Sequence, residues 1–182
     1  MRRVFILSLL AAGLISSMAC TGNDAPLSDN NGSGPSAAAL ISKTKTYPSD
    51  YATEAMHRGR VVRIDYDTRD YAEGTGATRT NTAYVYLPYG YDENTAQRYN
   101  VIYLVHGHYG TASTTFEAED GLQRKVLDHM VENGDMAPTI VVSPSYNYGQ
   151  PTANYVNADP YCRALPTELV NDLIPVVETR YR

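Results

Sequence analysis

The chain has 182 residues, 43% of them hydrophobic, and its 20 acidic and 15 basic residues give a net charge of −5. This acidic balance argues against nucleic acid and against anionic membrane surfaces as partners. Neither a cysteine pair nor a cluster of histidines supports a metal site, and no cofactor is expected.

The first twenty residues have the features of an export signal. Two arginines precede an apolar core from Val4 to Ile15, and small residues lead up to Cys20. The apolar core is too short for a membrane-spanning helix. Cys20 is similar to the lipid-acceptor position of bacterial lipoproteins, although Ser17 stands where such signals usually carry Leu. We expect residues 1–20 to lie outside the fold and Cys20 to be lipidated, with plain signal cleavage as the alternative.

This interpretation places the protein in the outer membrane as an exported lipoprotein, on the periplasmic or the cell-surface side. Residues 21–50 are rich in Asn, Asp, Ser, Gly, Pro and Ala and predict a flexible tether. The folded part is then residues 51–182, roughly 130 residues, which is enough for one core.

The folded part begins with two predicted strands. Arg60–Tyr66 alternates charged and apolar residues, and Thr82–Leu87 is rich in aromatic and β-branched residues before Pro88 ends it. A glycine-containing turn around Gly74 and Gly76 lies between them.

A third strand, Asn100–Val105, is a nearly continuous apolar run of the kind buried on both faces of a sheet. It breaks into His-Gly-His-Tyr-Gly at 106–110, where the glycines permit backbone angles that other residues avoid. A turn at this end of a strand can aim backbone N–H groups into a cavity, where α/β sheets bind their ligands. An ordinary strand with an ordinary glycine turn is an equally acceptable interpretation of this stretch alone.

The remaining elements alternate helix and strand. Asp120 is a candidate N-cap for a helix that runs to about Glu132 and ends at Asn133-Gly134. His129 is expected on the surface of that helix. A buried strand follows at Pro138–Val142, and then a long loop from 143 to about 163.

The last predicted element is a helix from Pro166 to Tyr181, with a kink at Pro175 because proline removes a backbone donor. The order β-β-β-α-β-α predicts the α/β class with a largely parallel sheet flanked by helices.

Three stretches now identify a family resemblance. Residues 83–91, 99–110 and 168–181 resemble, in order and spacing, motifs of the esterase family of α/β-hydrolases. That family contains feruloyl esterases, acetyl-xylan esterases and esterase-D-like enzymes. The resemblance covers about residues 60–182 and corresponds to the N-terminal half of the fold only.

In that family, a strand leading to a Gly-x-Ser-x-Gly nucleophile elbow comes next, and the catalytic acid and His follow the Ser in the chain. No Gly-x-Ser-x-Gly occurs in this sequence. We therefore expect the front half of an α/β-hydrolase fold, truncated before the nucleophile elbow, without the catalytic triad and inactive alone.

The resemblance also assigns roles to loop residues. It implies that the backbone N–H of His108, with Tyr109 next, is one donor of the oxyanion hole, and that His106, Gly107 and Gly110 shape the loop. Tyrosines after the fourth strand, Tyr146 and Tyr148, could stack on a sugar or an aromatic acyl group. Generic packing is the stronger alternative for these tyrosines, because the chain has 16 of them.

Two functions remain open. The first is a lipid-anchored carboxylic-ester hydrolase that acts on feruloyl or acetyl esters of a polysaccharide, or on a small ester. The second is a non-catalytic surface lipoprotein that uses half of a hydrolase fold as a binding module. In both, the membrane is a partner through the anchor at Cys20.

Overall fold

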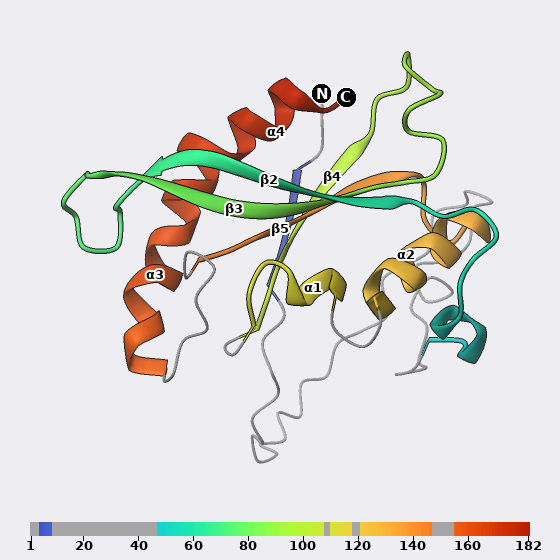
Figure 1. Cartoon of the computed structure of the whole chain (residues 1–182), viewed down its shortest axis with the longest axis horizontal. Coiled ribbons are helices and arrows are strands. Elements are labelled where there is room, and N and C mark those ends of the chain that lie inside the picture. Colours follow the sequence, from blue (N-terminus) through green and yellow to red (C-terminus); the bar gives the residue numbers. More distant parts are fainter. Residues whose placement is uncertain (1–3, 9–46, 108–109, 118–120, 147–154) are drawn as a thin grey trace, which may run out of the picture.

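The computed structural model describes residues 4–8, 47–107, 110–117, 121–146 and 155–182 (Figure 1). Within these residues, one five-stranded sheet has the order β1-β4-β5-β3-β2. Its strands are β1 (Val4–Ser8), β2 (Arg60–Arg69), β3 (Thr78–Leu87), β4 (Asn100–Val105) and β5 (Thr139–Pro144). The predicted boundaries of the third strand are those of β4. None of the helices in the described part of the chain is long and apolar enough to cross a membrane.

The strands β2 and β3 form a long antiparallel hairpin, in register from Arg60 opposite Leu87 to Arg69 opposite Thr78. Its turn contains Gly74 and Gly76, with φ of 69° and 67°, values that favour glycine. The hairpin is longer than predicted at its turn end, where polar residues extend both strands.

The sheet is mixed. The strand β3 pairs antiparallel with β5, whereas β5 with β4 and β4 with β1 pair in parallel. The α/β class is confirmed, and the parallel pairing expected of the sheet holds for its β1-β4-β5 part. A short turn can connect only antiparallel neighbours, so the hairpin contributes antiparallel strands.

The edge strand β1 comes from the segment predicted as an export signal. Val4–Ser8 pairs with residues 101–105 of β4 in parallel. No other strand among the described residues lies on that edge of β4. An extended apolar segment that pairs there satisfies backbone N–H and C=O groups of β4 that would otherwise be free. These residues thus join the sheet, unlike the expectation that residues 1–20 lie outside the fold. Signal function and cleavage stay predictions.

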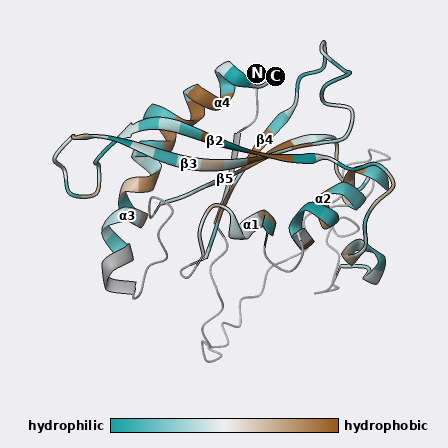
Figure 2. Ribbon diagram, viewed as in Figure 1, coloured by the Kyte–Doolittle hydropathy of each residue, from teal (hydrophilic) through white to brown (hydrophobic). Residues whose placement is uncertain are grey.

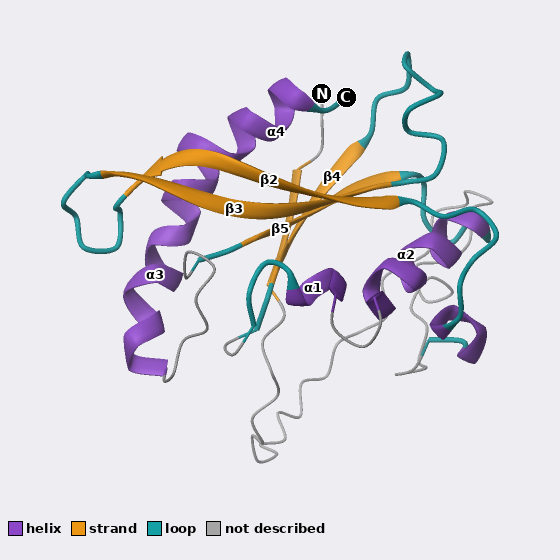
Figure 3. Ribbon diagram, in the orientation of Figure 1, coloured by secondary structure: helices purple, strands orange, loops and turns teal. Residues whose placement is uncertain are grey.

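Helices cover both faces of the sheet (Figure 3). One face carries α3 (Tyr155–Glu168), a π-helical turn (Leu169–Leu173) and α4 (Ile174–Arg180), which together form one rod. The other face carries α1 (Thr114–Glu117) and α2 (Leu122–Glu132), and a 3-10 turn, Ser49–Ala52, packs beside α2.

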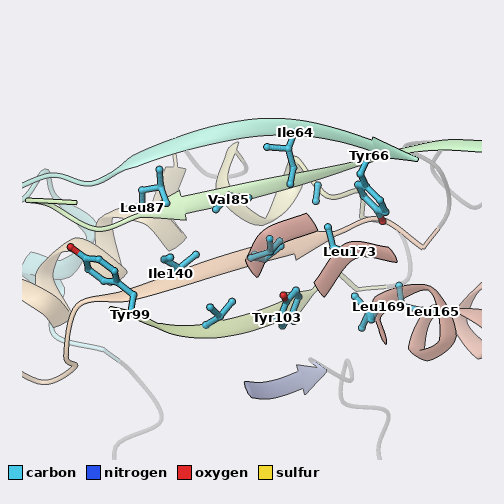
Figure 4. Packing of buried hydrophobic residues seen from close by; sticks show 14 of the residues in the cluster. Ile64, Tyr66, Val85, Leu87, Tyr99, Tyr103, Ile140, Leu165, Leu169 and Leu173 are labelled. Atoms are coloured by element: carbon cyan, nitrogen blue, oxygen red, sulfur yellow. The ribbon is translucent and has the colours of Figure 1, made fainter. Parts of the chain in front are cut away.

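The alternation of side chains along β3 connects the two layers. Val85 and Leu87 belong to the larger core cluster with Leu169 and Leu173 of the helical rod. Tyr86, from the opposite face of β3, packs in a smaller cluster with residues of α1 and β5. Figure 4 shows the larger cluster between the sheet and the rod. The core therefore lies on both faces of the sheet.

The helix α2 differs from its prediction in two ways. Its N-cap is Gly121, with φ 77°, and Asp120 lies outside the described residues. Its buried residues are polar, Asp128 and His129, so the surface position predicted for His129 is wrong. The ring of His129 stacks on Tyr51 of the 3-10 turn at 5.1 Å. Figure 2 shows α2 as mainly hydrophilic, in agreement with a helix held by polar contacts.

The carboxylate of Asp128 anchors α2 to the sheet. It accepts hydrogen bonds from the Gly59 amide (2.8 Å), the Tyr86 hydroxyl (2.9 Å) and the Arg124 guanidinium (2.7 Å). Burial raises the pKa of this carboxyl, and the same hydrogen bonds partly oppose the shift. A buried polar cluster thus adds to the apolar contact that Leu127 makes with the smaller core cluster.

The C-terminal rod begins earlier than predicted. α3 starts at Tyr155, within the stretch predicted as loop up to about 163. The kink predicted at Pro175 takes the form of a π-helical turn just before it, in which the Ile174 amide bonds to the Leu169 carbonyl. Wider turns of this kind accommodate the missing proline donor.

Candidate active-site loop

The loop after β4 lies at the carboxyl end of a buried parallel strand, beside β5. The amide of Gly110 donates a 3.0 Å hydrogen bond to the Gly107 carbonyl, which closes a turn over residues 107–110. The middle residues of that turn, His108 and Tyr109, lie outside the described residues. Their oxyanion role therefore stays a prediction, and the geometry available is that of the residues that hold the turn.

His106 and Tyr146 pack together beneath the turn. Their rings stack with centroids 4.4 Å apart and an interplanar angle of 22°. His106 Nδ1 lies 2.8 Å from the Gly107 carbonyl, and the Tyr146 hydroxyl donates to the same oxygen at 3.2 Å. Tyr146 is only 4% exposed, so it supports the loop as a packed side chain, and its contact with a substrate stays a prediction.

The protonation state of His106 follows from these contacts. A carbonyl oxygen can only accept, so Nδ1 carries the proton. Burial lowers the pKa of His106, and the hydrogen bond to Gly107 opposes that shift in part. In the neutral ring, Nε2 is then an acceptor, and it has no hydrogen-bond partner among the described residues.

Gly110 is required for space. A β-carbon there would lie 2.8 Å from Thr114 Oγ1 and 3.1 Å from the β-carbon of His106. Gly107 is not among the described glycines with positive φ, so other residues could adopt its backbone angles. Nothing lies within 4 Å of a β-carbon at Gly107, and the structure does not explain that glycine.

The first turn of α1 is tied to the loop and to β5. Thr114 Oγ1 accepts from the Thr111 amide at 3.0 Å and donates to the Thr111 carbonyl at 2.8 Å. The Ser143 hydroxyl donates to Thr115 Oγ1 at 2.7 Å. Ser143 is fully buried in β5, so it serves packing between elements and lies away from solvent.

A cavity of about 190 Å³ opens beside the loop. Its lining includes His106, Gly107, Thr115 and Gln123. The His106 Nε2 and Gln123 Oε1 atoms are both buried and without a partner in the described part of the chain. Because both can act as acceptors, this cavity fits a group that donates hydrogen bonds. No set of three His, Cys, Asp or Glu side chains in the described ranges could hold a metal ion.

The structure places the predicted site residues unequally. His106, Gly107, Gly110 and Tyr146 come together at one end of β4, whereas Tyr148 and Cys20, like the two oxyanion candidates, lie outside the described residues. Thr115 and Gln123 were missed, because no motif marks them. The signal that could have found them is their place on the helices that follow the loop.

A mixed sheet with helices on both faces, and a glycine-bearing loop at the carboxyl end of its buried parallel strand, give the chain the architecture of the α/β class. The family model described as "Putative esterase" matches residues 75–182. The chain belongs to this family, as the sequence motifs indicated.

The curated relatives include the protein named endo-1,4-beta-xylanase Y of Acetivibrio thermocellus, 36% identical over 135 residues, a match that covers 74% of this chain and 11% of the relative. Another is the endo-1,4-beta-xylanase/feruloyl esterase of Xylanibacter ruminicola, 29% identical over 134 residues, covering 69% of this chain and 16% of the relative. The chain thus spans a minor part of each relative.

Solved structures agree on the fold. A mutant of the feruloyl esterase module from Clostridium thermocellum, in complex with sinapinate, is 34% identical with a TM-score of 0.57, and the match covers 74% of this chain and 41% of that chain. A ferulic acid esterase from Anaeromyces mucronatus, in complex with ferulic acid, is 22% identical with a TM-score of 0.61, over 78% of this chain and 51% of that chain. The second match shows the fold alone.

Proposed function

We propose that this chain is the front part of a carboxylic-ester hydrolase that cleaves feruloyl or acetyl esters on polysaccharide. The observation that carries the proposal is the supported turn after β4, in which Gly107 and Gly110 close a loop over the stacked His106 and Tyr146. Relatives with feruloyl esterase names, and one solved with sinapinate, support this class of ester.

In the proposed mechanism, the turn supplies one backbone N–H, from His108 or Tyr109, to the oxyanion that forms when a serine attacks the ester carbonyl. Loss of one such donor costs roughly 3–4 kcal/mol of transition-state stabilisation. The second donor is the amide after the nucleophile. No Gly-x-Ser-x-Gly occurs in these 182 residues, so we assign the serine, the acid and the base to residues outside this sequence.

We further propose that the protein is exported and anchored through lipid at Cys20, which would hold the hydrolase at a membrane surface next to its polysaccharide. The basic start, the apolar core and the position of Cys20 in the sequence support this. Mass spectrometry of the membrane fraction tests it, because lipidation adds acyl chains at Cys20 and a Cys20→Ser variant would lose them.

The esterase proposal is tested with methyl ferulate and a nitrophenyl acetate. Residues 21–182 alone should give no hydrolysis above a heat-treated control. The product of the same reading frame extended through a Gly-x-Ser-x-Gly motif should hydrolyse at least one of these esters. Hydrolysis by residues 21–182 that a serine-directed inhibitor blocks would overturn the assignment of the nucleophile. An extended product that cleaves neither ester would overturn the hydrolase itself.

A further inference from the structure

The hydrogen-bond ladder between β3 and β5 ends at Ala83 and Pro144. Because proline has no backbone N–H, the ladder loses a donor at that position. One residue further, the carbonyl of Ser145 is bound by a side chain instead. The Asn81 amide donates to it through Nδ2 at 2.6 Å.

The side-chain amide of Asn81 has a single allowed orientation. Its Nδ2 also donates to Glu168 Oε1 at 2.7 Å, and its Oδ1 accepts from the Thr82 amide at 2.8 Å. Turning the amide over would bring Oδ1 against the Ser145 carbonyl and the Glu168 carboxylate, which are both acceptors. Glu168, together with the Ser145 carbonyl and the Thr82 amide, therefore fixes which way Asn81 faces.

Glu168 is in turn held by the sheet. The Tyr66 hydroxyl donates to the same Oε1 atom at 2.6 Å. Figure 4 shows Tyr66 on the side of β2 that faces the helical rod. Asn81 and Glu168 are each 2% exposed and Ser145 is fully buried, so these hydrogen bonds are shielded from water and strong relative to surface contacts.

The fixed carbonyl belongs to the peptide that precedes Tyr146. Orienting this peptide sets the direction in which the Tyr146 side chain leaves the backbone. That side chain stacks on His106 at 4.4 Å and donates to the Gly107 carbonyl. A continuous path of contacts thus runs from α3 through β3 to the turn at 106–110.

We propose that Asn81 and Glu168 are positioning residues for the active-site loop, which act on it by fixing the peptide between Ser145 and Tyr146. The catalytic consequence rests on the proposed function, since it requires that the turn carry an oxyanion donor. The structural consequence, which is the position of the Tyr146 ring against His106, does not rest on the proposed function. Without the Asn81 amide, the Tyr146 ring moves relative to His106 and the turn loses its lower support.

The test follows the His106 ring protons by NMR in the full chain. The stacked Tyr146 ring shifts these resonances, so they report the stacking directly. We expect Asn81→Ala and Glu168→Ala to move them toward the positions of an unstacked histidine. Glu168→Gln keeps an oxygen that can accept from Asn81 and should restore the wild-type positions.

The matched control is Thr68→Val. It removes another hydrogen bond between β2 and the helical rod, a partly buried one from Thr68 Oγ1 to Asp172 at 2.8 Å, without touching Ser145. This variant should lose stability and leave the His106 resonances in place. If Asn81→Ala does not fold, Asn81→Leu keeps a similar shape and removes the donor without adding a charge beside Glu168. Unchanged His106 resonances in a folded Asn81 variant would overturn the proposal.

A second measurement uses the esterase-active extended product. Asn81→Ala should lower kcat by about 10- to 100-fold with little change in KM, because displaced donors act on the transition state. Thr68→Val should keep a wild-type kcat. An unchanged kcat in a variant with moved His106 resonances would overturn the catalytic part. If no form cleaves the ester, the proposed function fails while the NMR result still decides the structural part.

Discussion

Several side chains of this chain act by binding a backbone carbonyl where regular hydrogen bonding stops. His106 and Tyr146 bind the Gly107 carbonyl, and Asn81 binds the Ser145 carbonyl. The Nε2 atom of His129 lies 3.2 Å from the Thr53 carbonyl oxygen. Each carbonyl belongs to a turn or to the end of a strand. Because buried carbonyls without partners are costly, a few polar residues determine how the loops leave the sheet.

Buried carboxyls make the stability of this chain depend on pH. Burial raises the pKa of Glu168 above its usual 4.5, while hydrogen bonds from Tyr66 and Asn81 oppose part of the shift. The folded state then holds a proton that the unfolded state releases first. The contribution of this group to stability is complete below pH 4.5 and is lost as the pH rises through the raised pKa.

We therefore predict that Glu168→Gln, which does not titrate, flattens this dependence. Urea unfolding between pH 4 and pH 8 should show the wild type losing stability relative to the variant as the pH rises. Each unit of pKa shift corresponds to about 1.4 kcal/mol. A difference between the two proteins that stays constant across this range would contradict the prediction.

At the scale of elements, α2 depends on one buried carboxylate more than on an apolar face. Asp128→Ala would leave the Gly59 amide, the Tyr86 hydroxyl and Arg124 Nη1 without their acceptor, while Arg124 Nη2 keeps Glu54. We predict a loss of about 3–5 kcal/mol in the free energy of unfolding, as expected when one partner of a buried charge cluster is removed. Urea denaturation measures it.

The control for this substitution is Asp67→Ala, which removes an exposed carboxylate from β2. Its effect should stay within about 0.5 kcal/mol, as for most surface substitutions. A loss below about 1 kcal/mol for Asp128→Ala would show that the apolar residues of α2 suffice to hold the helix.

The sequence predicted some features of β4, α3 and α2 well and others poorly, and the reasons are physical. The boundaries of β4 could be predicted because an apolar run and a glycine turn both mark them. The start of α3 could not, since Pro160 and the polar residues around it favour a loop locally and the helix is selected by packing on the sheet. The burial of His129 depends on Tyr51, a residue far away in sequence.

In the candidate site, too, the features marked by local sequence could be predicted and those set by packing could not. The strand end and the His-Gly-x-x-Gly pattern placed the loop correctly in the sequence. The support beneath it comes from Tyr146, just after β5, and Thr115 of α1 and Gln123 of α2 line the cavity beside it. Such partners depend on how elements pack together, and periodicity or motifs within one segment carry no information about them.

At the scale of the whole molecule, the sheet has one edge formed by β1. Because β1 pairs with β4 over residues 101–105, we predict that a chain beginning at Cys20 exchanges some amide hydrogens of β4 faster than the full chain does. Hydrogen exchange measured by NMR would show this. An exposed edge strand also promotes self-association.

The internal control for this comparison is β3, which has β2 on one side and β5 on the other. Its amides should exchange equally in both chains. Equal exchange of β4 amides in the two chains would mean that Val4–Ser8 does not protect the edge in solution.

The π-helical turn in the C-terminal rod has a geometric consequence for the core. Leu165, Leu169, Leu173 and Val177 are spaced four residues apart, and all are buried against the sheet. In an α-helix, each step of four residues overshoots a full turn by roughly 40°, so a row of this length would wind away from the sheet. The wider turn at Leu169–Leu173 takes up part of that angle. The wider turn thereby keeps the buried residues after it, such as Val177, on the side of the rod that faces the sheet. Deletion of one residue in this turn would rotate the rest of the rod and move those side chains away from the sheet.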